Sequence, residues 1–310
     1  MPHQRIDINN HINEKTNIAS WQVENPKAIV HILHGMGEHK ARYDHFASFL
    51  NQHDIHVYAH DHLGHGEAIS EDSPLGHFHN DDGFNKVVGI VEDVQNYIHL
   101  QHPGVPVFLL GHSMGSFIAQ HYLVDYPCRI KGLILSGSAY TPTPLLRALK
   151  FVAGIEALRL GKKGNSSVIN LLSFGSYNNN FKPRRTEFDW LSRNESSVDD
   201  YIADELCGFI CSCSGWQQLA SGLLVISKPE NLEKIPSTLP VSIISGDMDP
   251  VGNSGKYVKA LEQHWKNTGH HDVTLNLIEN ARHEVLNETD RELHYNALLQ
   301  WLEKQLKSPA

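Results

Sequence analysis

The sequence predicts an α/β fold, with a mostly parallel sheet, helices on both faces and an inserted helical cap. The chain has 310 residues, of which 40% are hydrophobic and 20% charged, a composition typical of a globular protein. Strand-like and helix-like patterns alternate near both ends of the chain, the order that builds a parallel sheet covered by helices. The alternation stops between about Thr141 and Pro236. We therefore expect a core of residues 1–140 and 237–310, interrupted by a cap of residues 141–236.

The first part of the core starts with two extended segments, residues 4–9 and 16–23, that favour a hairpin. Ala28–Leu33 is a continuous β-branched and apolar run, as expected for a strand buried on both faces. Helices and strands then alternate: a helix at Tyr43–His53, a strand at Ile55–Ala59, a helix at Asp81–His102, a strand at Val105–Leu110, a helix at Ser113–Tyr126 and a strand at Lys131–Ser136. Proline follows two of these helices, at positions 103 and 127, and marks their ends.

The cap pattern is helical, for example at Leu145–Leu160, and its joints at residues 161–167 and 176–180 are rich in Gly, Ser and Asn. Alternation resumes after the cap. The last part of the core is expected to hold a strand at Pro240–Ser245, a helix at Tyr257–Trp265, a strand at Val273–Ile278 and a final helix from about Asp290 to Leu306.

The charge balance is acidic, with 26 Lys and Arg against 35 Asp and Glu and a formal net charge of −9. Such a chain cannot neutralise a row of phosphates, so we expect no nucleic-acid partner. The N-terminus lacks the apolar stretch of a signal peptide, and no run reaches the roughly 18 apolar residues of a transmembrane helix. We therefore expect a cytoplasmic protein.

Histidines and cysteines are grouped at two places that could suggest a metal site. Several of the 22 histidines crowd into residues 55–66, but no fixed ligand spacing recurs. We expect polar loop residues that hydrogen-bond the backbone there, with His56 and His60 at strand edges, and keep a metal cluster as the alternative. The spacing of Cys207, Cys211 and Cys213 is not a standard zinc pattern either, and favours buried free thiols in a helix. No metal and no cofactor is expected.

The segment Gly111-His-Ser-Met-Gly115 matches G-x-S-x-G and lies between a predicted strand and a predicted helix. A sharp turn there holds the serine in a strained conformation, and glycines two positions before and after it remove steric clashes. The turn presents Ser113 at the carboxyl edge of the sheet, where open α/β sheets bind ligands. Ser113 is therefore the candidate nucleophile.

A serine nucleophile needs a base and an acid that orients the base, and in this architecture they follow in the order Ser, Asp or Glu, His. The strand at Pro240–Ser245 leads into Asp247 and Asp249, and spacing alone does not decide between them. The last strand leads into His283, the only histidine of that loop, which is the candidate base.

Two backbone N–H groups are expected to form the oxyanion hole. One belongs to Met114, the residue after the nucleophile. The other belongs to Met36, in the turn His34-Gly-Met-Gly37 that follows the first buried strand.

Together these segments resemble the monoacylglycerol lipase branch of the α/β-hydrolases, which also holds bacterial lysophospholipases and the serine aminopeptidase-type family. The resemblance rests on five ordered segments: His34-Gly-Met-Gly-Glu-His-Lys-Ala-Arg-Tyr43, Asp61-His-Leu-Gly-His-Gly66, Gly111–Gly115, Ser192–Asp204 and Gly246-Asp-Met-Asp-Pro250 with Arg282-His283. It implies an α/β-hydrolase fold, assigns the acid to Asp249, and equates residues 141–236 with a cap that covers an acyl-binding channel.

The resemblance also implies contacts with the glycerol end of a substrate from Glu38, Arg42 and Tyr201. Glu38 and Arg42 are four residues apart and could instead form an ion pair, and Tyr201 could be a residue of the cap core. The animal enzymes carry a second histidine three places after the catalytic one, where this chain has Leu286.

These residues predict a serine carboxylic-ester hydrolase that cleaves lipid monoesters, monoacylglycerol or lysophospholipid, through an acyl-enzyme. Residues 144–158 are mostly apolar and could line the acyl channel, touch a membrane transiently, or pack against the core. The alternatives are an aminopeptidase or amidase on the same triad, a short-chain carboxylesterase, and a silent binding protein on the same fold.

Overall fold

A computed structural model describes residues 4–127 and 129–308. Its eight-stranded sheet has the order β1-β2-β4-β3-β5-β6-β7-β8, in which β1 and β2 pair antiparallel, β2 runs antiparallel to β4, and the others are parallel. The strands are β1 (Gln4–Asn9), β2 (Lys15–Trp21), β3 (Ala28–Leu33), β4 (Ile55–His60), β5 (Val107–His112), β6 (Gly132–Ser136), β7 (Val241–Gly246) and β8 (Val273–Ile278). The predicted α/β fold and its first hairpin are confirmed.

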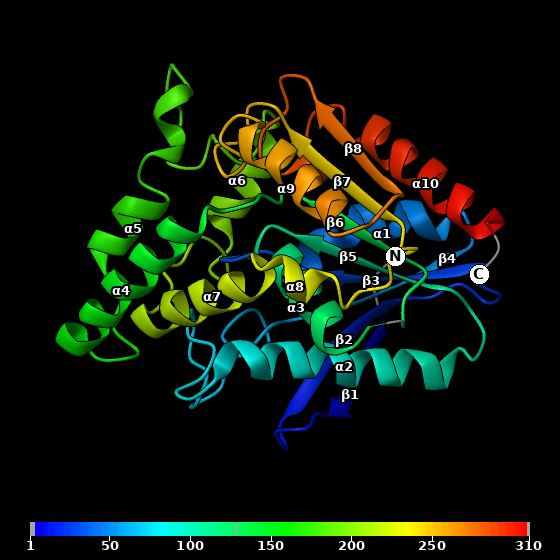
Figure 1. Ribbon diagram of the computed structural model, residues 1–310, viewed down its shortest axis with the longest axis horizontal. Coiled ribbons are helices and arrows are strands. Elements are labelled where there is room, and N and C mark those ends of the chain that lie inside the picture. The colour runs from blue at the N-terminus through cyan, green and yellow to red at the C-terminus, as the bar shows by residue number, and fades with distance from the viewer. Residues whose placement is uncertain (1–3, 128, 309–310) are drawn as a thin grey trace.

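Helices cover both faces of the sheet (Figure 1). The core helices are α1 (Asp44–Asn51), α2 (Gly83–Gln101), α3 (Met114–Asp125), α9 (Lys256–Asn267) and α10 (Arg291–Lys307), with short 3₁₀ turns η1 (Lys40–Tyr43) and η3 (Val285–Asn287). In β3, Ile29 and Leu33 pack with α2, α3 and α9, whereas Val30 and Ile32 pack with α1 and α10. Because successive side chains of a strand point to opposite faces, a continuous apolar run fills both layers.

The residues between β6 and β7 form helices and no strand of the sheet. These helices are α4 (Thr143–Leu160), α5 (Ser167–Ser173), η2 (Tyr177–Asn180), α6 (Glu195–Ala203), α7 (Cys213–Ile226) and α8 (Pro229–Leu232). Figure 1 shows α4, α5 and α7 together at one side of the sheet. Helix α4 packs on α7, and α7 packs on α3 of the core. The cap boundaries at residues 141 and 236 stay a prediction.

Strand β5 lies two residues further along the chain than the sequence predicts. Pro106 lacks an N–H and cannot donate to the sheet, whereas Gly111 and His112 still pair with β6, so the strand runs to the residue before Ser113. The nucleophile turn therefore starts directly at the end of the strand.

The expectation of polar loop histidines in residues 55–66 is right for the position of His62 and His65, which follow β4, but wrong for their exposure. His56, His60, His62 and His65 are each at most 2% exposed, because β4 lies inside the sheet between β2 and β3. The ring of His65 bonds the backbone carbonyl of Leu63, whereas the ring of His56 bonds the Ser20 hydroxyl and that of His60 bonds His31. The rings therefore belong to the interior of the protein.

The thiols also differ from their expected setting. Cys213 is the first residue of α7, whereas Cys207 and Cys211 lie in the irregular segment before it, and Cys207 is only half-buried. Within the described residues no helix has the length and apolarity needed to cross a membrane.

Candidate active site

The turn between β5 and α3 holds Ser113 in the strained conformation that the motif predicts, with φ 49° and ψ −118°. A Cβ at Gly111 would lie 2.4 Å from the carbonyl oxygen of Gly115, and a Cβ at Gly115 would lie 2.1 Å from that of Leu33. Real Cβ atoms do not approach oxygen so closely, so only glycine fits both positions. The N–H of Ser113 donates to the carbonyl of Ser136 on the neighbouring strand at 2.8 Å, which fixes the turn to the sheet.

His283 and Asp249 meet at the carboxyl edge of the sheet. The Nδ1 atom of His283 lies 2.9 Å from Oδ2 of Asp249, whose other oxygen accepts the N–H of Val251. Asp247, the other candidate, instead accepts the N–H of Asn280. Burial lowers the pKa of His283, but the charge and hydrogen bond of Asp249, together with smaller contributions from Glu284 and Glu38, raise it, and the pKa stands above the usual value for histidine. The pair can therefore hold a proton on the imidazole.

Ser113 and His283 line the same cavity. Among the described residues, no hydrogen bond of Ser113 Oγ or of His283 Nε2 is present. Such contacts are often long in an enzyme without substrate and tighten in the complex. Both residues therefore contribute to the wall of the same cavity, where a bound molecule could meet them.

The predicted oxyanion donors also reach this cavity. Met36 and Met114 line it, and within the described chain neither backbone N–H bonds another protein group. The neighbouring N–H, that of Gly35, is taken by Oε1 of Glu38 at 2.6 Å. In this turn the N–H of Gly35 is hydrogen-bonded within the protein, whereas the N–H of Met36 is available to a ligand.

The cavity has a volume of about 360 Å³ and is lined by both core and cap residues. Aromatic side chains form much of its wall: Phe117, Phe174, Tyr177, Phe188, Trp190, Tyr201, Phe209 and Trp216. No residue of 144–158 lines it, so of the alternatives left open for this segment, lining of this cavity is not observed. Helix α4 packs on α7 instead, and the cap contributes to the wall through α5, α7 and the segments around α6.

The residues expected near a glycerol group lie together, but they contact each other. Arg42 Nη1 donates to Oε2 of Glu38 at 2.8 Å, and its guanidinium lies 4.8 Å from the ring centre of Tyr201. The ion-pair alternative is therefore the observed contact. Glu38 and Tyr201 line the cavity, whereas Arg42 is behind the wall.

Sequence reasoning missed Glu284 and Trp190. Glu284 forms a two-pronged ion pair with Arg42, and the ring of Trp190 lies 5.1 Å from that of His283. The carbonyls of Trp190 and Leu191 accept the N–H groups of His283 and Glu284, at 3.3 and 2.7 Å. A carboxylate directly after the candidate base was a usable signal for Glu284. Nothing in the local sequence signals that Trp190 of the cap meets this loop.

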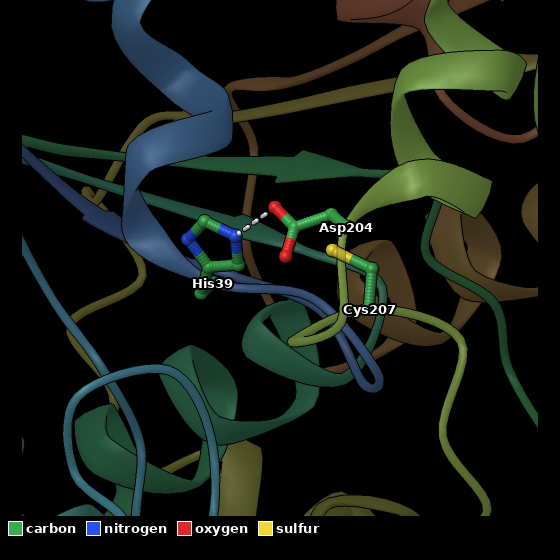
Figure 2. Close-up of side chains that lie close together, drawn as sticks. All are labelled: His39, Asp204 and Cys207. Carbon is green, nitrogen blue, oxygen red and sulfur yellow. Dashed lines mark hydrogen bonds and ion pairs between the residues drawn. The ribbon is translucent and has the colours of Figure 1, made fainter.

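Beside the cavity, His39, Asp204 and Cys207 bring three metal-ligand types together, within 4.8 Å of one another (Figure 2). Nδ1 of His39 accepts the N–H of Ala41, so Nε2 carries the proton and donates to Asp204 at 2.8 Å. A nitrogen that ligates a metal carries no proton. This contact is therefore a hydrogen bond between the core and the segment after α6.

Comparison with known proteins places these features in a family. Residues 24–290 match the family model described as serine aminopeptidase, S33. Monoglyceride lipase of Rattus norvegicus is 31% identical over 260 residues, which cover 83% of this chain and 76% of that protein. Monoacylglycerol lipase of Mycolicibacterium smegmatis is 28% identical over 291 residues, which cover 91% of this chain and 90% of that one.

Among solved structures, a thermostable carboxyl esterase from Bacillus coagulans, in complex with glycerol, has a TM-score of 0.88 to this chain. The two sequences are 26% identical, and the match covers 99% of each. The likeness therefore includes the cap helices as well as the sheet.

Proposed function

The chain belongs to the serine aminopeptidase S33 family and is a serine hydrolase, and from that premise we propose that it hydrolyses lipid monoesters, with monoacylglycerol as the favoured substrate. The observation that carries the proposal is the cavity. It is lined by core and cap residues with many aromatic side chains, Ser113 and His283 lie in its wall, and it offers the unpaired N–H groups of Met36 and Met114. An acyl chain fits the apolar wall, and an ester carbonyl fits the polar end.

In the proposed mechanism Ser113 Oγ attacks the carbonyl carbon while His283 takes its proton. Asp249 orients His283 and stabilises the imidazolium, and the N–H groups of Met36 and Met114 bind the oxyanion. His283 then protonates the leaving alcohol. Water attacks the acyl-enzyme by the same route and releases the fatty acid and free Ser113, so the cycle uses no other reactant.

The charges of the cavity favour an uncharged alcohol over a phosphate ester. Glu38, Glu187 and Glu284 are among the described residues that line it, and no lysine or arginine is. Arg42 balances one of the two charges of Glu38 and Glu284, and the remaining negative charge beside the cavity repels a phosphate. We therefore place lysophospholipid second, with Tyr201 as the candidate contact for the glycerol group.

Amide hydrolysis with recognition of a free amine is a weaker fit. Glu38, the candidate acidic group, already accepts from Gly35, Tyr43 and Arg42. A substrate amine would have to displace one of these donors. We accordingly keep aminopeptidase activity only as an outcome of the substrate test.

The test is a hydrolysis panel with the wild-type protein and Ser113→Ala. It holds 1-monoacylglycerols and p-nitrophenyl esters of several chain lengths, a lysophosphatidylcholine and an aminoacyl anilide. We expect the highest kcat/KM with long-chain monoacylglycerol and no turnover by the variant. A preference for lysophosphatidylcholine, short esters or the anilide would contradict the substrate, and an active Ser113→Ala would contradict the mechanism.

We also propose that α4 and α5 touch a lipid surface transiently. Their large apolar side chains are unusually exposed: Leu145, Phe151, Ile155, Leu158, Leu160, Val168, Leu171 and Leu172, of which Leu158 is 90% exposed. Apolar surface of this kind partitions into the boundary between lipid head groups and acyl chains.

The double variant Phe151→Ser with Leu158→Ser is expected to lose flotation with phosphatidylcholine vesicles while it keeps hydrolysis of a short ester. Leu100→Ser is the matched control, because Leu100 is 78% exposed on α2, outside the cap. Equal flotation of the double variant and the wild type would exclude this surface as the contact.

A further inference from the structure

The oxyanion turn and the His283 loop are joined by one chain of contacts. Gly35 of the turn donates to Oε1 of Glu38, and Oε2 of Glu38 accepts from Arg42. The same guanidinium then forms two parallel bonds to Glu284, from Nη1 to Oε1 at 2.6 Å and from Nη2 to Oε2 at 2.8 Å. Glu284 is the residue after His283. A continuous path therefore leads from the turn that offers Met36 N–H to the base.

This path is buried and its polar atoms are occupied. The side chains of Glu38, Arg42 and Glu284 are only 4%, 11% and 5% exposed. Both oxygens of each carboxylate accept from protein donors, which include Tyr43 for Glu38 and Asn287 for Glu284. Two-pronged bonds of arginine to carboxylate fix orientation as well as distance, and burial removes competing water. The network is thus built to hold backbone in place rather than to bind a substrate.

We propose that Glu284 is a positioning residue which, through Arg42 and Glu38, sets the oxyanion turn relative to His283. The inference rests on the proposed ester mechanism, in which the oxyanion turn binds the oxyanion and His283 transfers the proton. It adds a residue that the predicted site lacks. Glu38 and Arg42 then hold the oxyanion turn in place rather than contact glycerol, because their hydrogen-bonding groups already bond each other.

The charge of the network supplies an independent readout. One guanidinium lies between two carboxylates, so the trio carries a net charge of −1 beside the base. Arg42 lowers the pKa of Glu284 to about 2, although burial acts to raise it, so the carboxylate stays ionised during catalysis. Its negative charge also contributes to the raised pKa of His283, after the larger contribution of Asp249.

The first test is Glu284→Gln, assayed on p-nitrophenyl butyrate, whose short chain leaves head-group and acyl binding out of the comparison. We expect kcat to fall about tenfold to a hundredfold with little change in KM, because small misplacements of catalytic groups cost this much. The acidic limb of the kcat/KM profile is expected to move to lower pH, since the loss of a nearby negative charge lowers the pKa of His283. A merely structural role would not move that limb.

Arg42→Lys separates position from charge. Lysine keeps the positive charge but loses the fork, so kcat should fall as in Glu284→Gln while the acidic limb stays in place. The matched control is Glu156→Gln in the cap, because Glu156 also forms a two-pronged pair, with Arg159, away from the cavity. Its kcat and pH profile should equal those of the wild type.

The rate at which a fluorophosphonate labels Ser113 is measured alongside, because it needs the same base and oxyanion donors but no lipid substrate. Slower labelling by both site variants, with unchanged melting curves, would support the proposal even if the wild type cleaved none of the panel esters. Wild-type kcat and wild-type labelling in folded Glu284→Gln would overturn it. If that variant does not fold, wild-type kcat and labelling in Arg42→Lys would overturn it.

Discussion

Five buried histidines of this protein contrast with a sixth, His283, in how the nearby carboxylate is engaged. His31, His34, His60, His62 and His65 are each at most 1% exposed, and His283 is 3% exposed. Burial lowers the pKa of each of the five below the usual value, and to about 4 for His60 and His65. The pKa of His283 is raised instead. Burial thus keeps an imidazole neutral unless a carboxylate is directed at it.

The difference lies in how each carboxylate is engaged. Asp61 lies 3.8 Å from His34, but it is paired with Lys40 at 2.5 Å, so its charge is already balanced. Asp249 accepts only from Ser245, Val251 and His283 among the described residues, and no cation pairs with it. An uncompensated carboxylate is what turns one buried histidine into a candidate base.

The largest effect is expected from Asp249→Asn, which removes the carboxylate beside His283 and should leave its imidazole neutral, like those of the other buried histidines. We expect kcat to fall about a thousandfold or more on any ester that the wild type cleaves, because the imidazolium loses its partner and the ring its correct tautomer. Asp247→Asn is the control, because Asp247 is two residues away and its carboxylate accepts the N–H of Asn280 rather than a bond from His283. A loss of less than threefold in Asp249→Asn would refute the assignment.

The histidines of the interior should make the fold sensitive to acid. In the unfolded chain they bind a proton near pH 6.5, whereas His56, His60 and His65 have pKa values of about 4 in the fold. The unfolded state therefore takes up more protons between these values, and stability falls as pH drops from 6.5 towards 4. Each such histidine accounts for up to about 3 kcal/mol of this loss.

Urea unfolding at pH 4.5 to 8 measures this loss directly. The raised pKa of His283 acts in the opposite direction, adding stability below pH 6.5 that is lost as pH rises, but it is one group against several. His60→Gln should flatten the acid slope by about one proton. A free energy of unfolding that does not change below pH 6.5 would contradict this account.

The smallest effect is expected from the half-exposed histidine–carboxylate pair at the edge of the cap. Asp204 is 34% exposed where it bonds His39, so solvent screens the contact. Asp204→Asn should change the free energy of unfolding by no more than about 1 kcal/mol and kcat/KM on a short ester by less than twofold. A tenfold loss of activity would show that this contact supports the oxyanion turn, which Gly208 also touches through its bond to Gly37.

Local patterns predicted most of the fold, because a strand buried on both faces and a strained serine turn each leave a signature within a few residues. The candidate nucleophile and base followed from the same logic. The choice between Asp247 and Asp249 did not, since both follow β7 and only the direction of the loop separates them. Glu284 was missed because its partner Arg42 is 242 residues away in sequence. The burial of His56 and His60 depends on the position of β4 within the sheet, which the chain order does not reveal.

The hydrogen bonds that His283 and Glu284 donate to the carbonyls of Trp190 and Leu191 distinguish two parts of the cap for protein engineering. An exchange of residues 143–175 between relatives would replace the exposed apolar helices and part of the cavity wall while the support of the base stays intact. An exchange that included residues 186–194 would remove that support. Chimeras aimed at a new chain-length preference should therefore keep the second segment from the parent that supplies the triad.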